Sequence, residues 1–359
     1  MIPLIDAHLD LAWNALSFNR DLKRSVAELR RAEANMTDGA YRGACTTSLP
    51  ELRRAGVRVC VATLLARGGP EQAPKSVYHR TDLDHANQDI AYAAAKGQLA
   101  YYQLLESEGH LRMLRTREDL DAHWQDHHAP IGIILSMEGA DPIVHPEQAE
   151  AWWNDGLRAA GLTHYGRGHY GYGTGVEGPL SERGVALLRT FEALGIALDV
   201  THLCDESMEQ ALEQFGGPVL ASHHNCRSLV AGDRQLTDAQ VRQLVARDAV
   251  IGTAMDCWML HAGWERGETS CEVVSLEAAC DHIDHVCQIA GSSRHAAIGS
   301  DLDGGFGANQ TPRELDTIAD LSRLADILAR RGYTRTDIEA VYYGNWLRFF
   351  RRALPQRNT

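Results

Sequence analysis

Short apolar runs alternate with longer amphipathic stretches along the whole chain. The short runs are nearly continuous in apolar and β-branched residues, which is typical of strands covered on both faces of a parallel sheet. The amphipathic stretches have the spacing of helices that pack one side against such a sheet. Eight strands are predicted in this way, at residues 3–7, 57–65, 131–136, 161–164, 196–200, 219–222, 250–254 and 296–300.

Helices are expected between these strands. The clearest candidates are residues 83–108, 182–194, 207–215, 237–247 and 276–290. Eight strands that alternate with helices predict an α/β fold, a (β/α)₈ barrel of the TIM type. Residues 66–129 are interpreted as an insertion between the second and third strands. Because the sequence contains no repeat and no low-complexity linker, residues 1–359 are expected to form a single hydrolase barrel domain.

Composition narrows the choice of partners and location. A net charge of −13 over 359 residues disfavours nucleic acid and anionic membranes as partners. The amino terminus lacks the basic and apolar regions of a signal peptide, and no apolar run approaches the roughly 20 residues of a membrane helix. The eight cysteines include no Cys-x-x-Cys pair, which favours reduced, buried thiols. We therefore expect a cytoplasmic protein, with a homodimer left open as its assembly.

Side chains that can bind a metal follow several of the predicted strands. Each one alone is weak evidence, because a solvated carboxylate or a satisfied core histidine explains it equally well. All of them, however, fall at carboxyl ends of strands, where the active sites of barrel enzymes lie. In chain order they are His8, Asp10, Glu138, His202, His223 and Asp301. His8 and Asp10 are two residues apart, so an extended chain points both to the same side.

The ordered set of these segments resembles the membrane (renal) dipeptidase family, a branch of the amidohydrolase superfamily. The matching segments are residues 6–10, 136–139, 162–165, 199–202, 221–223 and 299–304. The resemblance implies two zinc ions per subunit. His8 and Asp10 would bind one ion, His202 and His223 the other, and Glu138 would bridge both.

The resemblance also implies roles for three residues that bind no metal. His164 would contact the substrate carbonyl and the tetrahedral intermediate, Arg234 would hold the terminal carboxylate, and Asp301 would be the acid/base. If Arg234 has no such role, it is expected to pair with Asp233 or Asp238 on the surface. The implied function is hydrolysis of small dipeptides, including those with D-residues at the carboxyl side, by a metal-bridging hydroxide.

Elementary chemistry agrees with this arrangement. Two dications held close together repel each other, and a shared carboxylate reduces that repulsion. Zinc lowers the pKa of bound water to roughly 7, so hydroxide is available at neutral pH. Two alternatives remain: a related amidohydrolase that acts on another small amide or a lactone, and a metal-binding protein without turnover. The second is disfavoured because His164, Arg234 and Asp301 are present together with the ligands.

Two departures from the family pattern concern substrate choice. His224 follows His223 where many relatives have a small residue. In residues 253–258 the only aromatic residue is Trp258, and none stands at the position expected near the substrate. The Gly/Tyr-rich run at residues 165–175 is expected to be a loop that shapes the pocket, since it does not open a helix as a dinucleotide-binding loop would. Two further histidine groups are interpreted as solvent-facing: His282 with His285, and His123 with His127 and His128.

Overall fold

The computed structural model describes residues 2–39, 41–69 and 83–357. The chain divides into two compact units. Unit 1 comprises Met1–Val61 and Ser222–Arg348, and unit 2 comprises Ala62–Ala221 and Phe349–Thr359. Strand β2 (Val57–Leu64) and helix α14 (Asn345–Ala353) each begin in unit 1 and end in unit 2.

Unit 1 contains buried strands and the helices that cover them. Besides the start of β2, its strands are β1 (Leu4–Leu9), β10 (Ile251–Thr253) and β11 (Ala296–Ile298). Strands β10 and β11 pair in parallel. Its α-helices are α1 (Leu11–Phe18), α2 (Val26–Glu33), α3 (Leu49–Arg54), α9 (Asp238–Ala246), α10 (Cys257–Leu260), α11 (Leu276–Ala290), α12 (Arg323–Arg330) and α13 (Arg335–Glu339).

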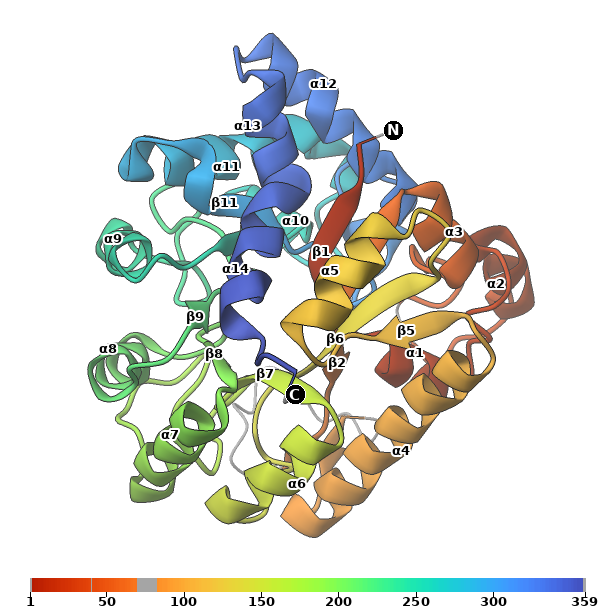
Figure 1. The fold of residues 1–359 in the computed structure, drawn as a ribbon. Coiled ribbons are helices and arrows are strands. Elements are labelled where there is room, and N and C mark those ends of the chain that lie inside the picture. Colours follow the sequence, from red (N-terminus) through yellow and green to blue (C-terminus); the bar gives the residue numbers. More distant parts are fainter. Residues whose placement is uncertain (1, 40, 70–82, 358–359) are drawn as a thin grey trace. The chain divides into compact units, whose positions relative to one another are not determined.

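Helix α11 shows how the sequence defines these elements. Ser275 caps its first turn by accepting a hydrogen bond from the Glu277 N–H, and Gly291 ends it in the left-handed conformation with φ 67°. Its apolar side, which includes Ile283 and Val286, is buried against α9, α12, β10 and β11. Figure 1 shows α11 beside β11. The structure confirms the helix predicted for residues 276–290.

Unit 2 contains a parallel sheet. Strands β6 to β9 pair in parallel in chain order, β5 pairs in parallel with β6, and β2 is a hydrogen-bonded neighbour of β6. The bounds of its strands are β5 (Leu111–Met113), β6 (Ile131–Met137), β7 (Leu157–Gly161), β8 (Ala197–Asp199) and β9 (Val219–Leu220), with the short pair β3 (Arg67–Gly68) and β4 (Asp84–His85) outside this sheet. Its helices are α4 (Gln88–Ser107), α5 (Arg117–Gln125), α6 (Ala149–Asn154), α7 (Glu182–Leu194) and α8 (Asp205–Gln214).

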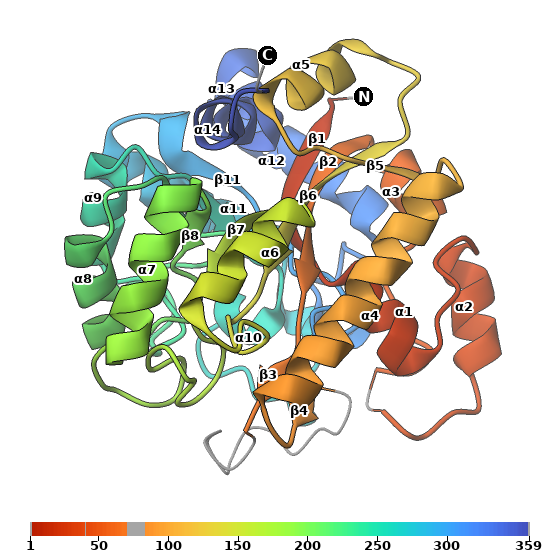
Figure 2. The same cartoon turned by 60° about the horizontal axis from the view of Figure 1, so that its bottom comes forward.

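Helices α6, α7 and α8 lie side by side over the strands of unit 2. Helix α7 contacts both neighbours and β8, as Figure 2 shows. Ser181 caps its start through the Gly184 N–H, and Leu187, Leu188 and Phe191 form its buried side. The bounds of α7 agree with the predicted helix at residues 182–194.

The fourth predicted strand is placed wrongly by the sequence. The strand was expected at residues 161–164, but β7 spans Leu157–Gly161 and ends where the prediction begins. The cause is Arg158, a charged residue within a buried strand. Its guanidinium donates hydrogen bonds to the backbone carbonyls of Arg115, Trp153 and Leu157, which compensate for its burial.

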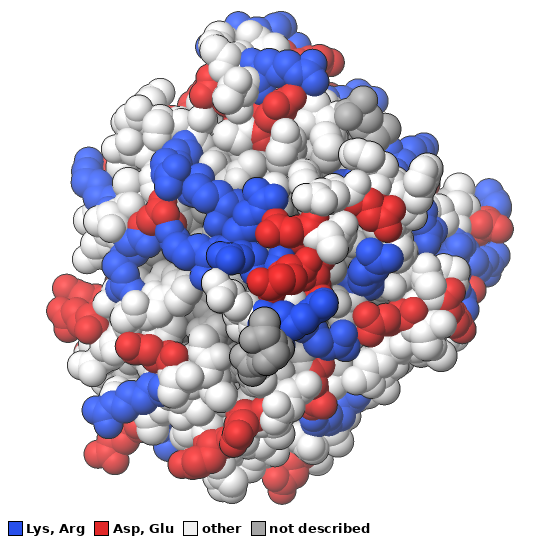
Figure 3. All heavy atoms as spheres, in the orientation of Figure 1, with Lys and Arg blue, Asp and Glu red and all other residues white. Residues whose placement is uncertain are grey.

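The excursion between β2 and β6 adds to the sheet of unit 2. It holds β3, β4, α4, β5 and α5, and residues 70–82 within it lie outside the described part of the chain. Acidic and basic side chains both occur on the face drawn in Figure 3. Within the described ranges, no helix is long and apolar enough to cross a membrane.

Candidate active site

In unit 1, the carboxyl ends of two strands bring three predicted site residues together. His8 lies in β1, Asp10 follows that strand, and Asp301 follows β11. The Nε2 atom of His8 is 3.6 Å from Asp10 Oδ2 and 3.8 Å from Asp301 Oδ1. One ligand atom from each residue lies within 4.8 Å of the other two, so the three side chains are spaced closely enough to share an ion. Asp301 is thus nearly as close to His8 as Asp10 is.

The hydroxyl group of Ser222 orients two of the predicted ligands. It lies 2.8 Å from Nδ1 of His223 and 3.4 Å from Nδ1 of His8, and the two imidazole rings have centroids 3.7 Å apart. A metal-binding histidine typically uses its second ring nitrogen in a contact of this kind, which fixes the orientation of the ring. The Nε2 atoms of His8 and His223 are therefore the ones positioned to bind an ion.

Asp6 ties β1 to the segment that follows β11. Its Oδ1 accepts hydrogen bonds from the backbone N–H groups of His8, at 3.2 Å, and Ser300, at 2.9 Å. The side chain is fully buried, and burial raises the pKa of its carboxyl group. Asp6 thus fixes the backbone of His8 relative to the residue that precedes Asp301.

The loop after β11 has an unusual backbone conformation that its neighbours hold in place. Asp301 and Asp303 have φ angles of 57° and 65°, in the left-handed region that few non-glycine residues adopt. The buried carboxylate of Asp303 accepts four hydrogen bonds of 2.7–2.9 Å from the N–H and O–H groups of Thr46 and Thr47. A Cβ atom at Gly304 would lie 1.8 Å from Asp301 Oδ1, so glycine is needed to accommodate that carboxylate.

In unit 2, three other predicted site residues come together. Glu138 follows β6, His164 follows β7, and His202 follows β8. Oε1 of Glu138 is 3.0 Å from Nε2 of His202 and 3.6 Å from Nε2 of His164. The two rings are 4.2 Å apart, and all three side chains are buried. Glu138 and His202 were predicted as ligands and His164 as a substrate contact, yet His164 is also close enough to be a ligand.

The Gly/Tyr-rich loop at residues 165–175 packs against the ends of β7 and β8. Thr174 Oγ1 lies 3.1 Å from Nδ1 of His202, which leaves Nε2 directed at Glu138. A Cβ atom at Gly173 would lie 1.9 Å from the carbonyl oxygen of His164 and 3.1 Å from that of His202, so the loop can approach both histidines only with glycine there.

Arg234 is buried rather than paired at the surface. It is 2% exposed, and its Nη2 atom donates a 2.9 Å hydrogen bond to the backbone carbonyl of His223. Asp238, one of the surface partners considered for it, instead lies 2.8 Å from Nε2 of His285. The surface alternative for Arg234 is therefore wrong, and its guanidinium lies beside a predicted metal ligand of the same unit.

The sequence model of the membrane dipeptidase family (peptidase family M19) matches residues 1–358. The chain belongs to this family. Membership confirms the resemblance seen in the sequence and the predicted enzyme class, a metal-dependent dipeptidase.

Similar sequences and structures agree with this assignment. A protein from the pqqA 5′ region of Klebsiella pneumoniae is 28% identical over 72% of this chain and 96% of its own length. Dipeptidase aclJ of Aspergillus oryzae is 26% identical over 64% of this chain, and the match spans only 53% of that enzyme.

Two solved structures share the fold across nearly the whole chain. One is a metallopeptidase described as dipeptidase AC, with TM-score 0.78 and 21% identity over 98% of this chain and 99% of that one. The other is a metallopeptidase from Rhodobacter sphaeroides bound to a phosphinate mimic of L-Ala-D-Ala, with TM-score 0.77 and 20% identity over the same shares. This likeness confirms the predicted (β/α)₈ barrel.

The donor groups of this family member suit a metal ion. In each unit they are imidazole nitrogens and carboxylate oxygens, the ligands that zinc accepts most readily after thiolates. Hydroxyl groups of Ser222 and Thr174 contact the outer nitrogens of three of these histidines. Such outer contacts are typical of built metal sites and are not needed in a chance cluster of polar residues.

Two histidines that the sequence assigned to solvent-facing groups are buried in this dipeptidase. His282 is 2% exposed and accepts a 2.9 Å hydrogen bond at Nδ1 from the Cys226 N–H, and His123 is completely buried. Their acidic neighbours in the sequence suggested a solvated face. The helical pattern contained a usable signal, because His282 lies on the same side of α11 as Ala279, Ile283 and Val286.

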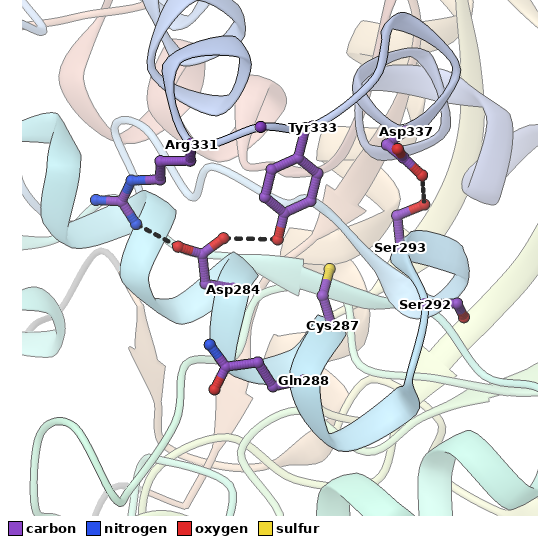
Figure 4. A pocket seen from close by; sticks show the side chains of 9 residues that line it. Asp284, Cys287, Gln288, Ser292, Ser293, Arg331, Tyr333 and Asp337 are labelled. Carbon is purple, nitrogen blue, oxygen red and sulfur yellow. Dashed lines mark hydrogen bonds and ion pairs between the residues drawn. The ribbon is translucent and has the colours of Figure 1, made fainter.

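Unit 1 also contains a surface cavity of about 440 Å³ that involves none of the predicted site residues. It is lined by residues of α11, α13 and the segments next to them, including Asp284, Cys287, Arg331, Tyr333 and Asp337 (Figure 4). Its charged groups have partners within the lining: Arg331 Nη1 and the Tyr333 hydroxyl both donate to Asp284, at 2.5 and 2.6 Å, and the Ser293 hydroxyl donates to Asp337 at 2.8 Å. Nothing in this lining demands a ligand.

Proposed function

We propose that this protein hydrolyses the peptide bond of small dipeptides with two zinc ions, and that residues 1–359 form a single hydrolase barrel domain. His8 and Asp10 would hold one ion, His202 and His223 would hold the other, and Glu138 would be shared by both. The contacts from Ser222 and Thr174 to the outer nitrogens of the histidines support this set of ligands. When bound, zinc ions polarise a carbonyl oxygen and lower the pKa of water to roughly 7.

The observation that carries the proposal is the position of Arg234. Its guanidinium is buried and hydrogen-bonded to the backbone of His223, which supports its role as the anchor for a substrate carboxylate. A guanidinium binds a carboxylate through two parallel hydrogen bonds, a geometry that favours a substrate with a free terminal carboxylate. An amidase whose substrates lack a free carboxylate would not need the guanidinium of Arg234 for binding.

Two other residues complete the proposed mechanism. Asp301 accepts the proton of the attacking water and passes it to the departing amine, a role that its left-handed backbone and the neighbouring Gly304 support by fixing the carboxylate. His164 donates to the substrate carbonyl oxygen as it becomes negatively charged. The phosphinate mimic of L-Ala-D-Ala bound to the Rhodobacter sphaeroides relative supports D-residues at the carboxyl side of the substrate.

We also place the protein in the cytoplasm. All eight cysteines are free thiols and six of them are buried, which supports a reducing compartment.

A dipeptide panel separates this proposal from its alternatives. We expect hydrolysis that a chelator abolishes and added zinc restores, with two zinc ions per chain by elemental analysis. Hydrolysis of lactones or blocked amides instead of free dipeptides would favour the related amidohydrolase. Zinc binding without any turnover would indicate a metal-binding protein.

A variant of Arg234 tests the dipeptidase assignment directly. Arg234→Met should lower kcat/KM for a free dipeptide by about 30-fold or more, because it leaves a buried carboxylate unpaired at roughly 2–5 kcal/mol. It should change the rate for the same dipeptide with an amidated carboxyl end much less. Arg242→Met, which removes the same charge from an exposed position on α9, is the matched control. Equal losses on both substrates would count against a carboxylate anchor.

A further inference from the structure

Four buried polar atoms without hydrogen-bond partners occur on two connected segments of unit 1. They are Nδ1 of His224, Nη1 of Arg234, Oε1 of Gln235 and Oδ1 of Asp256. Each of these side chains is at most 3% exposed. Because folded proteins leave few buried polar groups unpaired, four of them on adjacent segments indicate a site that a polar ligand completes.

Direct contacts hold the two segments together. The Gln235 Nε2 atom donates to the carbonyl of Met259 at 2.8 Å. Asn225 donates through Nδ2 to the carbonyl of Ala254 at 3.2 Å, and its Oδ1 accepts from the Ala254 N–H at 3.0 Å. Asp256 lies between Ala254 and Met259 in the chain, and Arg234 is close enough to lower the pKa of its carboxyl group.

Arg234 is fixed in place but only partly satisfied. Its Nη2 atom donates to the His223 carbonyl, and its own backbone carbonyl is hydrogen-bonded to the His224 ring. The unpaired Nη1 atom is thus held rigidly, as an anchor for a carboxylate requires.

Asp256 is a buried acid with incomplete compensation. It precedes α10, and hydrogen bonds from the backbone N–H and the side chain of Trp258 satisfy part of its carboxyl group, while Oδ1 has no partner. Its nearest charged partner is Arg266, whose Nη2 atom is 3.6 Å from Oδ2 and whose side chain is 46% exposed, so solvent screens that attraction. Burial raises the pKa of Asp256 to about 7 against the opposing effects of Arg266, Trp258 and Arg234.

We propose that Asp256 is a specificity-determining residue that selects dipeptides whose carboxyl-terminal residue carries a cationic or N–H-bearing side chain. This inference rests on the proposed function, since Arg234 anchors the terminal carboxylate while Asp256 Oδ1 accepts from the side chain of the same residue. The opposite charges of the pair recognise the carboxylate and the cation together. A substrate without the donor leaves Asp256 unpaired, and sites built for a donor reject such analogues strongly.

The test compares two dipeptides of equal size. One is Ala-Lys, and in the other a methyl group replaces the lysine ammonium, as in Ala-(2-aminoheptanoic acid), with both enantiomers of the second residue prepared. We expect the wild-type enzyme to favour Ala-Lys in kcat/KM by at least about tenfold. Asp256→Asn should reduce that ratio by about tenfold, because it slows Ala-Lys and relieves the unpaired charge opposite the methyl group.

Asp233→Asn is the matched control, because it removes the same charge from an exposed position beside Arg234 and should keep the wild-type ratio. Hydrolysis of both dipeptides with a ratio near one, or a ratio unchanged in Asp256→Asn, would overturn the inference and leave the dipeptidase proposal standing. Failure to hydrolyse either dipeptide would also overturn the inference if other dipeptides of the panel are hydrolysed, whereas failure on the whole panel would overturn the dipeptidase proposal instead. In that case calorimetric titration with free lysine and with 2-aminoheptanoic acid tests Asp256 alone, and equal affinities would reject its role.

Discussion

Replacing Asp303 by asparagine should destabilise the protein far more than the small change in shape suggests. The Asp303 carboxylate is 2% exposed and accepts hydrogen bonds from Thr46 N–H and O–H at Oδ1, and from Thr47 N–H and O–H at Oδ2. Arg20 Nη1 lies 4.0 Å from Oδ2. In Asp303→Asn one of the two acceptor oxygens becomes an NH₂ group, whichever way the amide turns.

The size of the stability loss depends on whether each of the four donors can still make a hydrogen bond in the variant. The threonine hydroxyl that faces the new NH₂ can rotate and accept from it, but the backbone N–H cannot, and a buried unsatisfied N–H costs about 1–3 kcal/mol. The two hydrogen bonds that remain lose their charged acceptor, at about 1 kcal/mol each, because charge-assisted bonds are roughly twice as strong as neutral ones. Arg20 also loses a nearby negative charge. We therefore expect a loss of about 3–5 kcal/mol in the free energy of unfolding, as for other broken buried ion networks.

Urea denaturation followed by circular dichroism measures this loss. The matched control is Asp316→Asn, because Asp316 also pairs with an arginine, Arg30 at 2.7 Å, but its side chain is 69% exposed. The control should lose at most about 1 kcal/mol. Similar losses in both variants, or a loss below about 1 kcal/mol in Asp303→Asn, would refute the reasoning that the burial of these hydrogen bonds sets their value.

Two further predictions follow from histidines. In the proposed mechanism His164 contacts the substrate and binds no zinc. His164→Leu should therefore lower kcat by at least about tenfold and leave the zinc content unchanged. Loss of zinc from this variant, measured by elemental analysis, would instead make His164 a ligand. Burial lowers the pKa of His282 to about 4 from its ordinary 6.5, so stability is lost as the pH falls from 6.5 through 4, by up to about 3 kcal/mol. Urea denaturation at pH 7 and pH 4 measures this loss of stability. The loss should be smaller in His282→Asn than in the wild type, because the asparagine does not titrate and its amide oxygen can still accept from the Cys226 N–H. Equal losses in the two proteins would contradict the role of His282 in this pH dependence.

The sequence predicts most of the fold because burial and helix capping leave clear patterns. The bounds of α7 and α11 agree with prediction because a serine precedes each helix and a left-handed glycine ends it, at Gly195 and Gly291. Strand β6 is found because all its residues are buried and its apolar run is unbroken. Strand β7 is misplaced because Arg158 interrupts its apolar pattern, and the carbonyl groups that satisfy Arg158 come partly from a distant segment that no local pattern reveals.

The sequence predicts the candidate ligands of the site, but it does not predict the residues that orient them. Ligand-type side chains at the ends of strands predict His8, Asp10, Glu138, His202 and His223 as metal ligands, and this set remains a prediction. The hydroxyl groups that orient the imidazole rings could not be predicted in this way. Thr174 is 28 residues away from His202 in the chain, and it belongs to a loop whose course depends on Gly173. Serine and threonine are too common for such a role to be read from composition or spacing.

The motif around Asp301 illustrates how the supports act on the chemistry. Ser300, on one side of Asp301, is held through its N–H by the buried Asp6, and Asp303, on the other side, is held by four hydrogen bonds. Both Asp301 and Asp303 have left-handed φ angles, which cost about 1–3 kcal/mol each and persist only where the surroundings fix them. An acid/base must keep its position while charge shifts around it, so rigid neighbours serve it better than a flexible loop would. In the proposed mechanism these three acids have different tasks: Asp6 and Asp303 hold the backbone on either side, and Asp301 transfers the proton.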